Sequence, residues 1–340
     1  MRDARVNLSY HHHRQQFNLL TNFLLTKDDM TRLISLGSLA ALFFSSTFVL
    51  NRAMSLQGGH WAWTSSLRFG FMLIFLVVLL LATQGKKALV DVKDVFLRHW
   101  RFWILSGSIG FGVFYSLITF SSQYAAGWIV ATTWQTTILA TPIVLIFFGR
   151  KVPTKGLLFT GIIFIGIILV NIEHAALTSL REVLFSALPV LVAAFAYPTG
   201  NQFVWEARMG HNPRIPKIDH PVLENGFARV LLLTLGSIPF WIVLLLLSSP
   251  PAPSRGQLLS TALVALLSGV IATTLFLYAR HLCRQPYEIA AVDATQSMEV
   301  VFSLLGEIIF LGGKLPGPLG MAGVALTIIG LIAYMRIQAN

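Results

Sequence analysis

The feature that most constrains this chain is a series of ten long apolar stretches separated by short polar connections. A helix needs about 20 mainly apolar residues to cross the hydrocarbon layer of a membrane, which is about 30 Å thick. The ten stretches are residues 33–55, 61–83, 101–122, 127–148, 156–172, 184–205, 225–247, 258–281, 286–311 and 317–335. The sequence therefore predicts an all-α integral membrane protein with ten transmembrane helices, which we number spans 1 to 10.

The composition agrees with a chain whose solvent is the bilayer. Only 11% of the 340 residues are charged, whereas a soluble domain has about 25%. The net charge is +11, but the Lys and Arg residues form no single stripe or patch, so we expect no nucleic-acid partner. Cys283 is the only cysteine, which excludes an internal disulfide and a cysteine-based metal site. We expect neither a metal ion nor a cofactor.

The Lys and Arg residues alternate between the connections as the positive-inside rule requires. With the amino terminus inside, the inner segments hold 19 of the 25, and the remaining two, Arg68 and Arg229, fall within spans. The outer connections hold only Arg52, Arg181, Arg255 and Lys314. This asymmetry predicts a multi-pass protein of the inner cell membrane with both termini cytoplasmic.

Two segments outside the spans have their own patterns. Residues 1–29 contain no apolar core followed by a cleavage site, so they predict a disordered cytoplasmic tail rather than a signal peptide. Met30 directly precedes span 1 and is an alternative start of the chain. Residues 92–101 place apolar side chains at helical spacing between charges, which predicts an interfacial helix on the inner leaflet.

The chain contains an internal repeat. The segment Leu-Ser-Gly-Ser-Ile at 105–109 matches Leu-Ser-Gly-Val-Ile at 267–271, and Gly-Arg-Lys-Val-Pro at 149–153 pairs with Gly-Gly-Lys-Leu-Pro at 312–316. Arg68 and Arg229 are related by nearly the same offset, and each match joins a span to the fifth span after it. Because five is odd, the second half enters the membrane from the opposite face. This predicts two inverted five-helix repeats, residues 30–172 and 173–340.

These motifs resemble a known family. Phe-Ser-Ser-Thr-Phe-Val at 44–49, Leu-Arg-Phe-Gly at 67–70 and their counterparts in the second half are similar to the EamA-type drug/metabolite transporter superfamily. The resemblance covers residues 33–335 and is closest to the ten-span multidrug resistance efflux transporters. It implies efflux of a drug-like or metabolite solute. The family often has Gly-Glu after span 4, where this chain has Gly149 and Arg150, so no role is transferred to that position.

Ionisable side chains at membrane depth are the leading site candidates, because they are costly to bury and usually face a cavity or a partner. In span 9, Glu299 lies near the midplane, and Asp293 and Gln296 share its polar stripe. Glu299 and Asp293 are candidates for proton coupling or substrate contact. The alternative is structural, in which these acids pair with Arg68 or Arg229 and hold the halves together. The arginines can also extend to the headgroups.

Spans 4 and 6 supply further candidates. Trp134 and Gln135 stand in an unusually polar part of span 4 and can line a cavity, although polar groups also join helices. Tyr197 and Asn201 flank Pro198 and Gly200 in span 6, so this segment either exposes carbonyl groups to a cavity or forms a packed kink.

The function that these features favour is a secondary transporter, not an enzyme, that moves a small solute across the membrane by alternating access. The sequence leaves open whether transport is coupled to protons. It also leaves open whether the chain forms a homodimer. The alternative function is that of a membrane-embedded enzyme acting on a lipid or polyprenyl-linked substrate. A channel or a scaffold is the third and less favoured function. The sequence contains no Walker loop, nucleophile elbow or HExxH motif.

Overall fold

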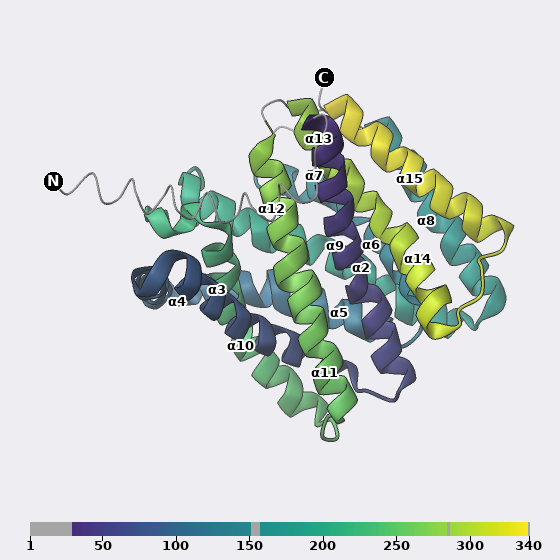
Figure 1. The fold of residues 1–340 in the computed structure, drawn as a ribbon, viewed down its shortest axis with the longest axis horizontal. Helices are drawn as coiled ribbons and strands as arrows, with labels where there is room; N and C mark the ends of the chain where they lie inside the picture. The colour runs from purple at the N-terminus through teal and green to yellow at the C-terminus, as the bar shows by residue number, and fades with distance from the viewer. Residues whose placement is uncertain (1–28, 151–156, 284–285, 339–340) are drawn as a thin grey trace.

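The computed structural model describes residues 29–150, 157–283 and 286–338. Within these ranges every regular element is a helix (Figure 1), which confirms the predicted all-α membrane fold. The elements are α2 (Asp29–Leu56), α3 (Trp61–Arg98), α4 (Trp100–Gly107), η1 (Ser108–Val113), α5 (Phe114–Ser121), α6 (Gly127–Trp134), α7 (Thr137–Phe147), α8 (Leu157–Leu177), α9 (Leu180–Met209), η3 (Pro221–Glu224), α10 (Gly226–Ser248), α11 (Arg255–Val264), η4 (Ala265–Ala272), α12 (Thr273–Leu282), α13 (Pro286–Ala294), η5 (Thr295–Ser297), α14 (Met298–Leu311) and α15 (Pro318–Gln338). The predicted tail lies outside the described residues, apart from its last residue.

These elements follow the ten predicted spans. Span 3 comprises α4, η1 and α5, span 4 comprises α6 and α7, span 8 comprises α11, η4 and α12, and span 9 comprises α13, η5 and α14. In the described part of the chain, nine stretches are long and apolar enough to cross a membrane. The tenth, α15, has a shorter apolar part, Pro318–Tyr334. The number of crossings is therefore nine or ten, and the value of ten stays a prediction.

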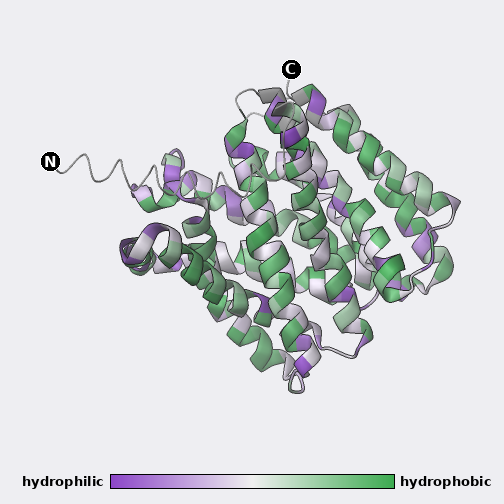
Figure 2. Ribbon diagram, in the orientation of Figure 1, coloured by the Kyte–Doolittle hydropathy of each residue, from purple (hydrophilic) through white to green (hydrophobic). Residues whose placement is uncertain are grey.

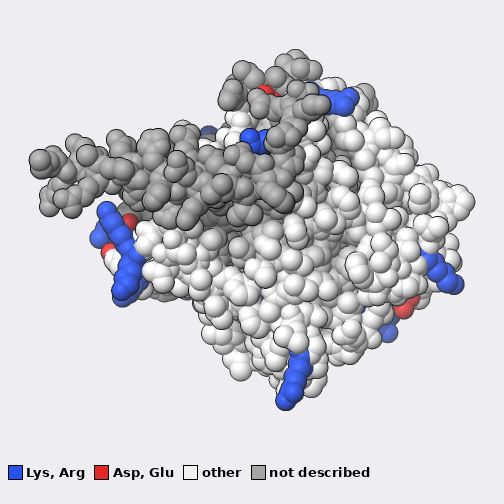
Figure 3. All heavy atoms as spheres, viewed as in Figure 1, with Lys and Arg blue, Asp and Glu red and all other residues white. Residues whose placement is uncertain are grey.

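The outer surface of the bundle is apolar. Hydrophobic residues cover the helices along most of their length (Figure 2), and Phe147, Leu247 and Phe310 are 84%, 81% and 76% exposed. Lys and Arg gather at the margins of the face seen in Figure 3, with an uncharged surface between them. This is the distribution that a lipid environment requires, because only apolar side chains are stable against acyl chains.

Helix α3 extends well beyond the predicted end of span 2. Gly85 has a φ of 76° and separates the membrane-length part from a second helical segment that ends at Arg98. In that segment Val92 and Val95 are buried against the bundle. A residue with a side chain rarely adopts this φ, so the glycine allows the chain to turn at this point. The segment matches the helix predicted after span 2, although it is helical from Gly85 onward.

Helix α8 continues to Leu177, so the predicted boundary between residues 172 and 173 falls inside a helix. The connection between the halves consists of Thr178 and Ser179. Ser179 accepts a hydrogen bond from the Glu182 amide, and the Glu182 carboxylate accepts one from the Ser179 amide. This capping box starts α9 immediately after the connection.

Several pairings of spans recur when every span number is shifted by five. Helices α5 and α7, of spans 3 and 4, pack against α9 of span 6, while η4 and α14, of spans 8 and 9, pack against α2 of span 1. Likewise α4 packs against α10, and η4 packs against α3. Helices α8 and α15, spans 5 and 10, lie side by side at one edge (Figure 1). This pattern is expected of a repeated unit, and the inverted relation of the halves stays a prediction.

Contacts between the connections define two ends of the bundle. At one end, Arg150 pairs with Glu206, Arg208 with Glu224, and Arg280 with Asp293. This end also carries Lys86, Lys87, Lys93, Arg98, Arg101, Arg214 and Lys217, and we call it the cationic end. At the opposite end, the Trp63 indole donates to the Pro251 carbonyl, and the Arg52 guanidinium donates to the Ser122 carbonyl.

Candidate substrate site

A cavity of about 650 Å³ lies inside the bundle and is lined by spans 1 to 4 and 6 to 9. The predicted candidates Glu299, Asp293, Gln296, Trp134, Gln135, Tyr197 and Asn201 all line it, and so do Arg68 and Arg229. This volume lies within the range of about 300–1,000 Å³ that is usual for small-molecule sites. The cavity is therefore large enough for an organic solute.

The cavity extends from the cationic end to beyond the middle of the bundle. Arg208 and Arg229 line it close to the cationic end, near the last turn of α9 and the first turn of α10. Its deepest lining includes Phe48 and Arg68, which lie about two helical turns from the opposite end. At its mouth, the hydrogen bond and charge of Arg208 lower the pKa of Glu224.

Several contacts between spans close the opposite end. The Tyr115 hydroxyl donates to Asn51 Oδ1 over 3.2 Å, which joins spans 3 and 1. Glu307 accepts a hydrogen bond from the Gly127 amide over 2.8 Å, so a carboxylate near the end of span 9 caps the start of α6. Glu307 does not line the cavity and has a role in helix packing.

Two helices are interrupted beside the cavity. In span 4, Gln135 and Thr136 separate α6 from α7, and in span 9 the short 3₁₀ segment η5 separates α13 from α14. The repeat offset of 162 relates Gln135 to Ser297, so the interruptions fall at equivalent positions. The chain stays helical at both points but tightens to the 3₁₀ form: in span 4 the Gln135 amide donates to the Thr132 carbonyl and the Ile138 amide to the Gln135 carbonyl. A 3₁₀ stretch within a helix often marks a functional hinge.

Spans 3 and 8 carry a second pair of irregularities. Both contain a π-helical segment: η1 directly follows the first Leu-Ser-Gly motif, and η4 includes the second. Such segments often occur at functional sites, since they rotate the side chains that follow them. The structure therefore shows local departures from α-helix at matching places in the two halves, and four of the eight spans that line the cavity contain them.

Glu299 is the first acid after the interruption in span 9. Its side chain is 9% exposed, and among the described residues it has neither a hydrogen bond nor an ion pair. An isolated carboxylate at this depth is stable only when it is neutral, hydrated or paired with a ligand. The geometry therefore leaves Glu299 free to bind a proton or a solute group.

Asp293 has a partner of its own. Arg280 donates to both carboxylate oxygens over 2.6 and 2.8 Å, which joins α12 to α13 at the cationic end. The side chain of Gln296 donates to the Gly37 carbonyl over 3.4 Å. Both residues line the cavity, but their polar groups also hold spans 8, 9 and 1 together.

The predicted ion pairs of Arg68 and Arg229 with acids of span 9 do not occur in the described part of the structure. Arg229 donates to the carbonyl groups of Leu223 and Glu224. Arg68 donates to the Ser268 hydroxyl over 3.1 Å, and its guanidinium carbon lies 3.9 Å from the centre of the Tyr115 ring. The reason is one of position, because these arginines start from spans 2 and 7 and meet other neighbours first.

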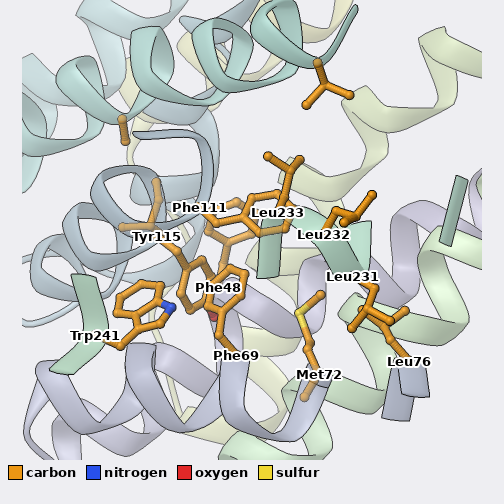
Figure 4. Close-up of a cluster of buried hydrophobic side chains, with 14 of the residues drawn as sticks. Phe48, Phe69, Met72, Leu76, Phe111, Tyr115, Leu231, Leu232, Leu233 and Trp241 are labelled. Atoms are coloured by element: carbon orange, nitrogen blue, oxygen red, sulfur yellow. The ribbon is translucent and has the colours of Figure 1, made fainter. Parts of the chain in front are cut away.

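Aromatic rings form much of the cavity wall. Trp134, Tyr197 and Phe114 form one group, with ring centres 4.9 to 5.7 Å apart. Phe69 and Phe111 form another group with Tyr115, and Trp241 stacks behind Phe69 (Figure 4). Such walls favour solutes with a flat or apolar body.

Helix α9 runs without interruption from Leu180 to Met209 and includes Pro198. Gly200 packs against the backbone of Gly110 in η1. Tyr197 and Asn201 nevertheless line the cavity from the same helix. The Asn201 amide donates to the Tyr197 carbonyl over 3.1 Å.

Sequence reasoning missed several apolar residues of the cavity lining. Phe69 and Leu233 line the cavity, but in sequence they are indistinguishable from lipid-facing residues. Thr47 and Ser268 were also missed, although both stand in motifs that mark the resemblance and the repeat. A polar residue within a repeated motif was the available signal.

Arg150 stands at the position where the family often has Glu. It is not among the residues that line the central cavity and forms a separate ion pair with Glu206. Its guanidinium donates to both oxygens of the fully buried Glu206 carboxylate over 2.6 Å, and it lies 4.4 Å from the centre of the Trp205 ring. Gln202 donates to the same carboxylate over 2.9 Å. Arg150 therefore compensates a buried acid in span 6 and ties it to the end of span 4.

The fold and the cavity define a multi-pass membrane protein with a central cavity. The chain belongs to the EmrE family, because residues 31–340 match the family described as "Putative multidrug resistance efflux transporter". It is 41% identical to the uncharacterized protein YjlA of Bacillus subtilis (strain 168) over 88% of this chain and 93% of that protein. It is also 38% identical to an uncharacterized 42.1 kDa protein of Shouchella clausii, over 78% of this chain and 69% of that protein.

A protein of known crystal structure has a similar fold. The two structures have a TM-score of 0.58 at 15% sequence identity, over 90% of this chain and 98% of that one. At this identity the similarity concerns the fold alone.

Proposed function

We propose that this protein is a secondary transporter that exports a small organic solute by alternating access. The observation that carries the proposal is the pair of interrupted helices, spans 4 and 9, at equivalent positions beside the cavity. A 3₁₀ stretch within a helix often marks a functional hinge, and matching stretches in the two halves suit a site around which both halves move. Membership of an efflux family supports the direction of transport.

The distribution of Lys and Arg supports the orientation of the site. By the positive-inside rule the cationic end faces the cytoplasm of an inner-membrane protein. The cavity extends from that end, and contacts such as Tyr115 with Asn51 close the other. This is the conformation in which an exporter takes up its cargo.

In this proposal Glu299 couples transport to a proton. It is buried beside the interruption, and no described residue neutralises it. A carboxylate in this position exchanges its charge most readily for a proton or for a cationic group of the cargo. Asp293 contributes less, because Arg280 already compensates it.

Transport can be measured in proteoliposomes with three fluorescent solutes that share one apolar body: 2-naphthoate, 2-naphthamide and (2-naphthylmethyl)ammonium. We expect flux of at least one probe, faster with a pH gradient. Glu299→Gln should abolish the dependence on the gradient and leave the melting temperature unchanged, because the amide keeps the shape but does not titrate.

Glu182→Gln is the matched control, because Glu182 lies in the capping box of α9, outside the cavity. It should keep gradient-driven flux. Full gradient dependence in Glu299→Gln would exclude Glu299 as the coupling acid. Chemical conversion of a lipid or polyprenyl-linked substrate without flux of any solute would instead support an enzyme.

A further inference from the structure

The charges that face the cavity do not balance. Among its described lining residues, Arg208 is paired with Glu224 and Asp293 with Arg280. Two cations, Arg68 and Arg229, then remain against a single unpaired acid, Glu299. The lining keeps an excess of positive charge even when Glu299 is ionised, and the excess grows when Glu299 binds a proton.

Arg68 is the more exceptional of the two cations. It is 8% exposed, lies at the deep end of the cavity, and has no carboxylate partner in the described part of the chain. Its Nε is buried without a hydrogen-bond partner. Burying a charge without a counter-ion is costly in a medium of low dielectric constant. A site that holds such a cation beside a cavity is completed by an anion.

The neighbours of Arg68 favour an oxygen ligand. Ser268 accepts hydrogen bonds from Arg68 over 3.1 Å and from Thr47 over 2.7 Å. Its own hydroxyl hydrogen therefore remains available to an acceptor. The guanidinium and this hydroxyl together present donors from spans 2 and 8, a pattern that suits a carboxylate better than a cation.

The walls around this group are apolar. Phe48, Phe69 and Phe111 line the cavity near Arg68, and the ring of Tyr115 supports the guanidinium at 3.9 Å. A cargo that fits has an anionic group at one side and an apolar body, such as a ring system, at the other.

On the basis of the transport function proposed above, we infer that the cargo is an amphipathic organic carboxylate whose anionic group binds Arg68 and Ser268. Span 2 and span 8 belong to different halves of the chain, so the anion joins the halves at the deep end of the cavity. Glu299 then titrates next to an anionic cargo rather than competing for a cationic one.

Calorimetric titration of the purified full chain in nanodiscs tests this inference. The probes are 2-naphthoate, 2-naphthalenesulfonate, 2-naphthamide and (2-naphthylmethyl)ammonium. We expect 2-naphthoate to bind at least about tenfold more tightly than the amide and the ammonium compound, which corresponds to about 1.4 kcal/mol. Equal binding of the sulfonate would extend the site to other organic anions and keep the role of Arg68.

The variants separate a ligand role from a structural one. Arg68→Gln should lower the affinity for 2-naphthoate to that for the amide without changing the affinity for the amide, and Arg68→Lys should retain part of the preference. The melting temperature of unliganded Arg68→Gln should be unchanged or higher. Arg181→Gln is the matched control, since Arg181 also rests on an aromatic ring, Phe185, but lies outside the cavity.

Three results would overturn the inference: no binding of 2-naphthoate, equal or tighter binding of the ammonium probe, or an equal loss for all probes in Arg68→Gln. The transport proposal fails differently. Flux of the ammonium probe alone would support a transporter and contradict the anion site. Selective binding of 2-naphthoate without flux of any probe would keep the anion site and contradict transport.

Discussion

At the scale of residues, buried charges in this protein differ in whether they have partners. Glu206 and Glu307 are deeply buried, and each accepts hydrogen bonds, from Arg150 and from the Gly127 amide respectively. Glu299 and Arg68 line the cavity, and no described residue forms an ion pair with either of them. Compensated charges stabilise the contacts between helices, whereas uncompensated ones carry a cost that a ligand or a proton can relieve.

This difference predicts a large effect at Arg150. Arg150→Gln leaves the buried Glu206 carboxylate with Gln202 as its main partner, so it should lower the free energy of unfolding by about 2–3 kcal/mol, less than for a fully buried pair because Arg150 is partly exposed. Adding Glu206→Gln should restore most of the loss, because no buried charge then remains. Unfolding in denaturing detergent can measure both. Equal losses in the single and double variants would contradict the explanation.

At the scale of elements, the cavity depends on close packing of irregular helices. Gly200 of α9 meets the backbone of Gly110 in η1, and a methyl group at Gly200 would collide with it. The two glycines allow spans 3 and 6 to approach each other, and this approach places Tyr197 beside Phe114 at the cavity wall.

Gly200→Ala should therefore separate these helices and lower the free energy of unfolding by about 1–3 kcal/mol. It should also weaken probe binding, because Tyr197 moves with α9. Gly161→Ala is the control, since nothing lies near the position of its added methyl group, and its effect should stay within about 1 kcal/mol. Apparent melting temperatures in detergent would show this difference. If the two variants behaved alike, the close approach would not be essential.

The elements also show how far sequence reasoning reaches. Length and apolar composition predict helices and their order well, because the bilayer imposes both. Depth along span 9 likewise predicted that Glu299 lies near the centre, and the polar stretch of span 4 predicted that Trp134 can line a cavity. Partner choice was not predictable, because Arg280 finds Asp293 through the packing of α12 on α13, and no pattern within one helix encodes that distance.

At the scale of the whole molecule, a central cavity, a closed end and a partly repeated arrangement of helices occur together. The cavity is continuous with the cationic end, while contacts such as Arg52 with the Ser122 carbonyl close the opposite one. Since several span pairings recur on a shift of five, we expect that the two halves exchange conformations. Alternating access then requires that the opposite end opens when the cationic end closes.

Thr137 provides a position for testing this claim. It follows the interruption in span 4 and lines the cavity. A Thr137→Cys variant with Cys283 replaced by Ser would carry a single thiol within the proposed pathway, in proteoliposomes of one orientation. The reagent should be a thiol-specific label that cannot cross the membrane.

The most direct measurement compares the rates of labelling at Thr137→Cys from the two sides. The account predicts fast labelling from the cationic end, and slower labelling from the opposite end that stops when a cross-link joins spans 1 and 3 near Asn51 and Tyr115. Equal rates from both sides, unaffected by the cross-link, would indicate an open channel and contradict alternating access.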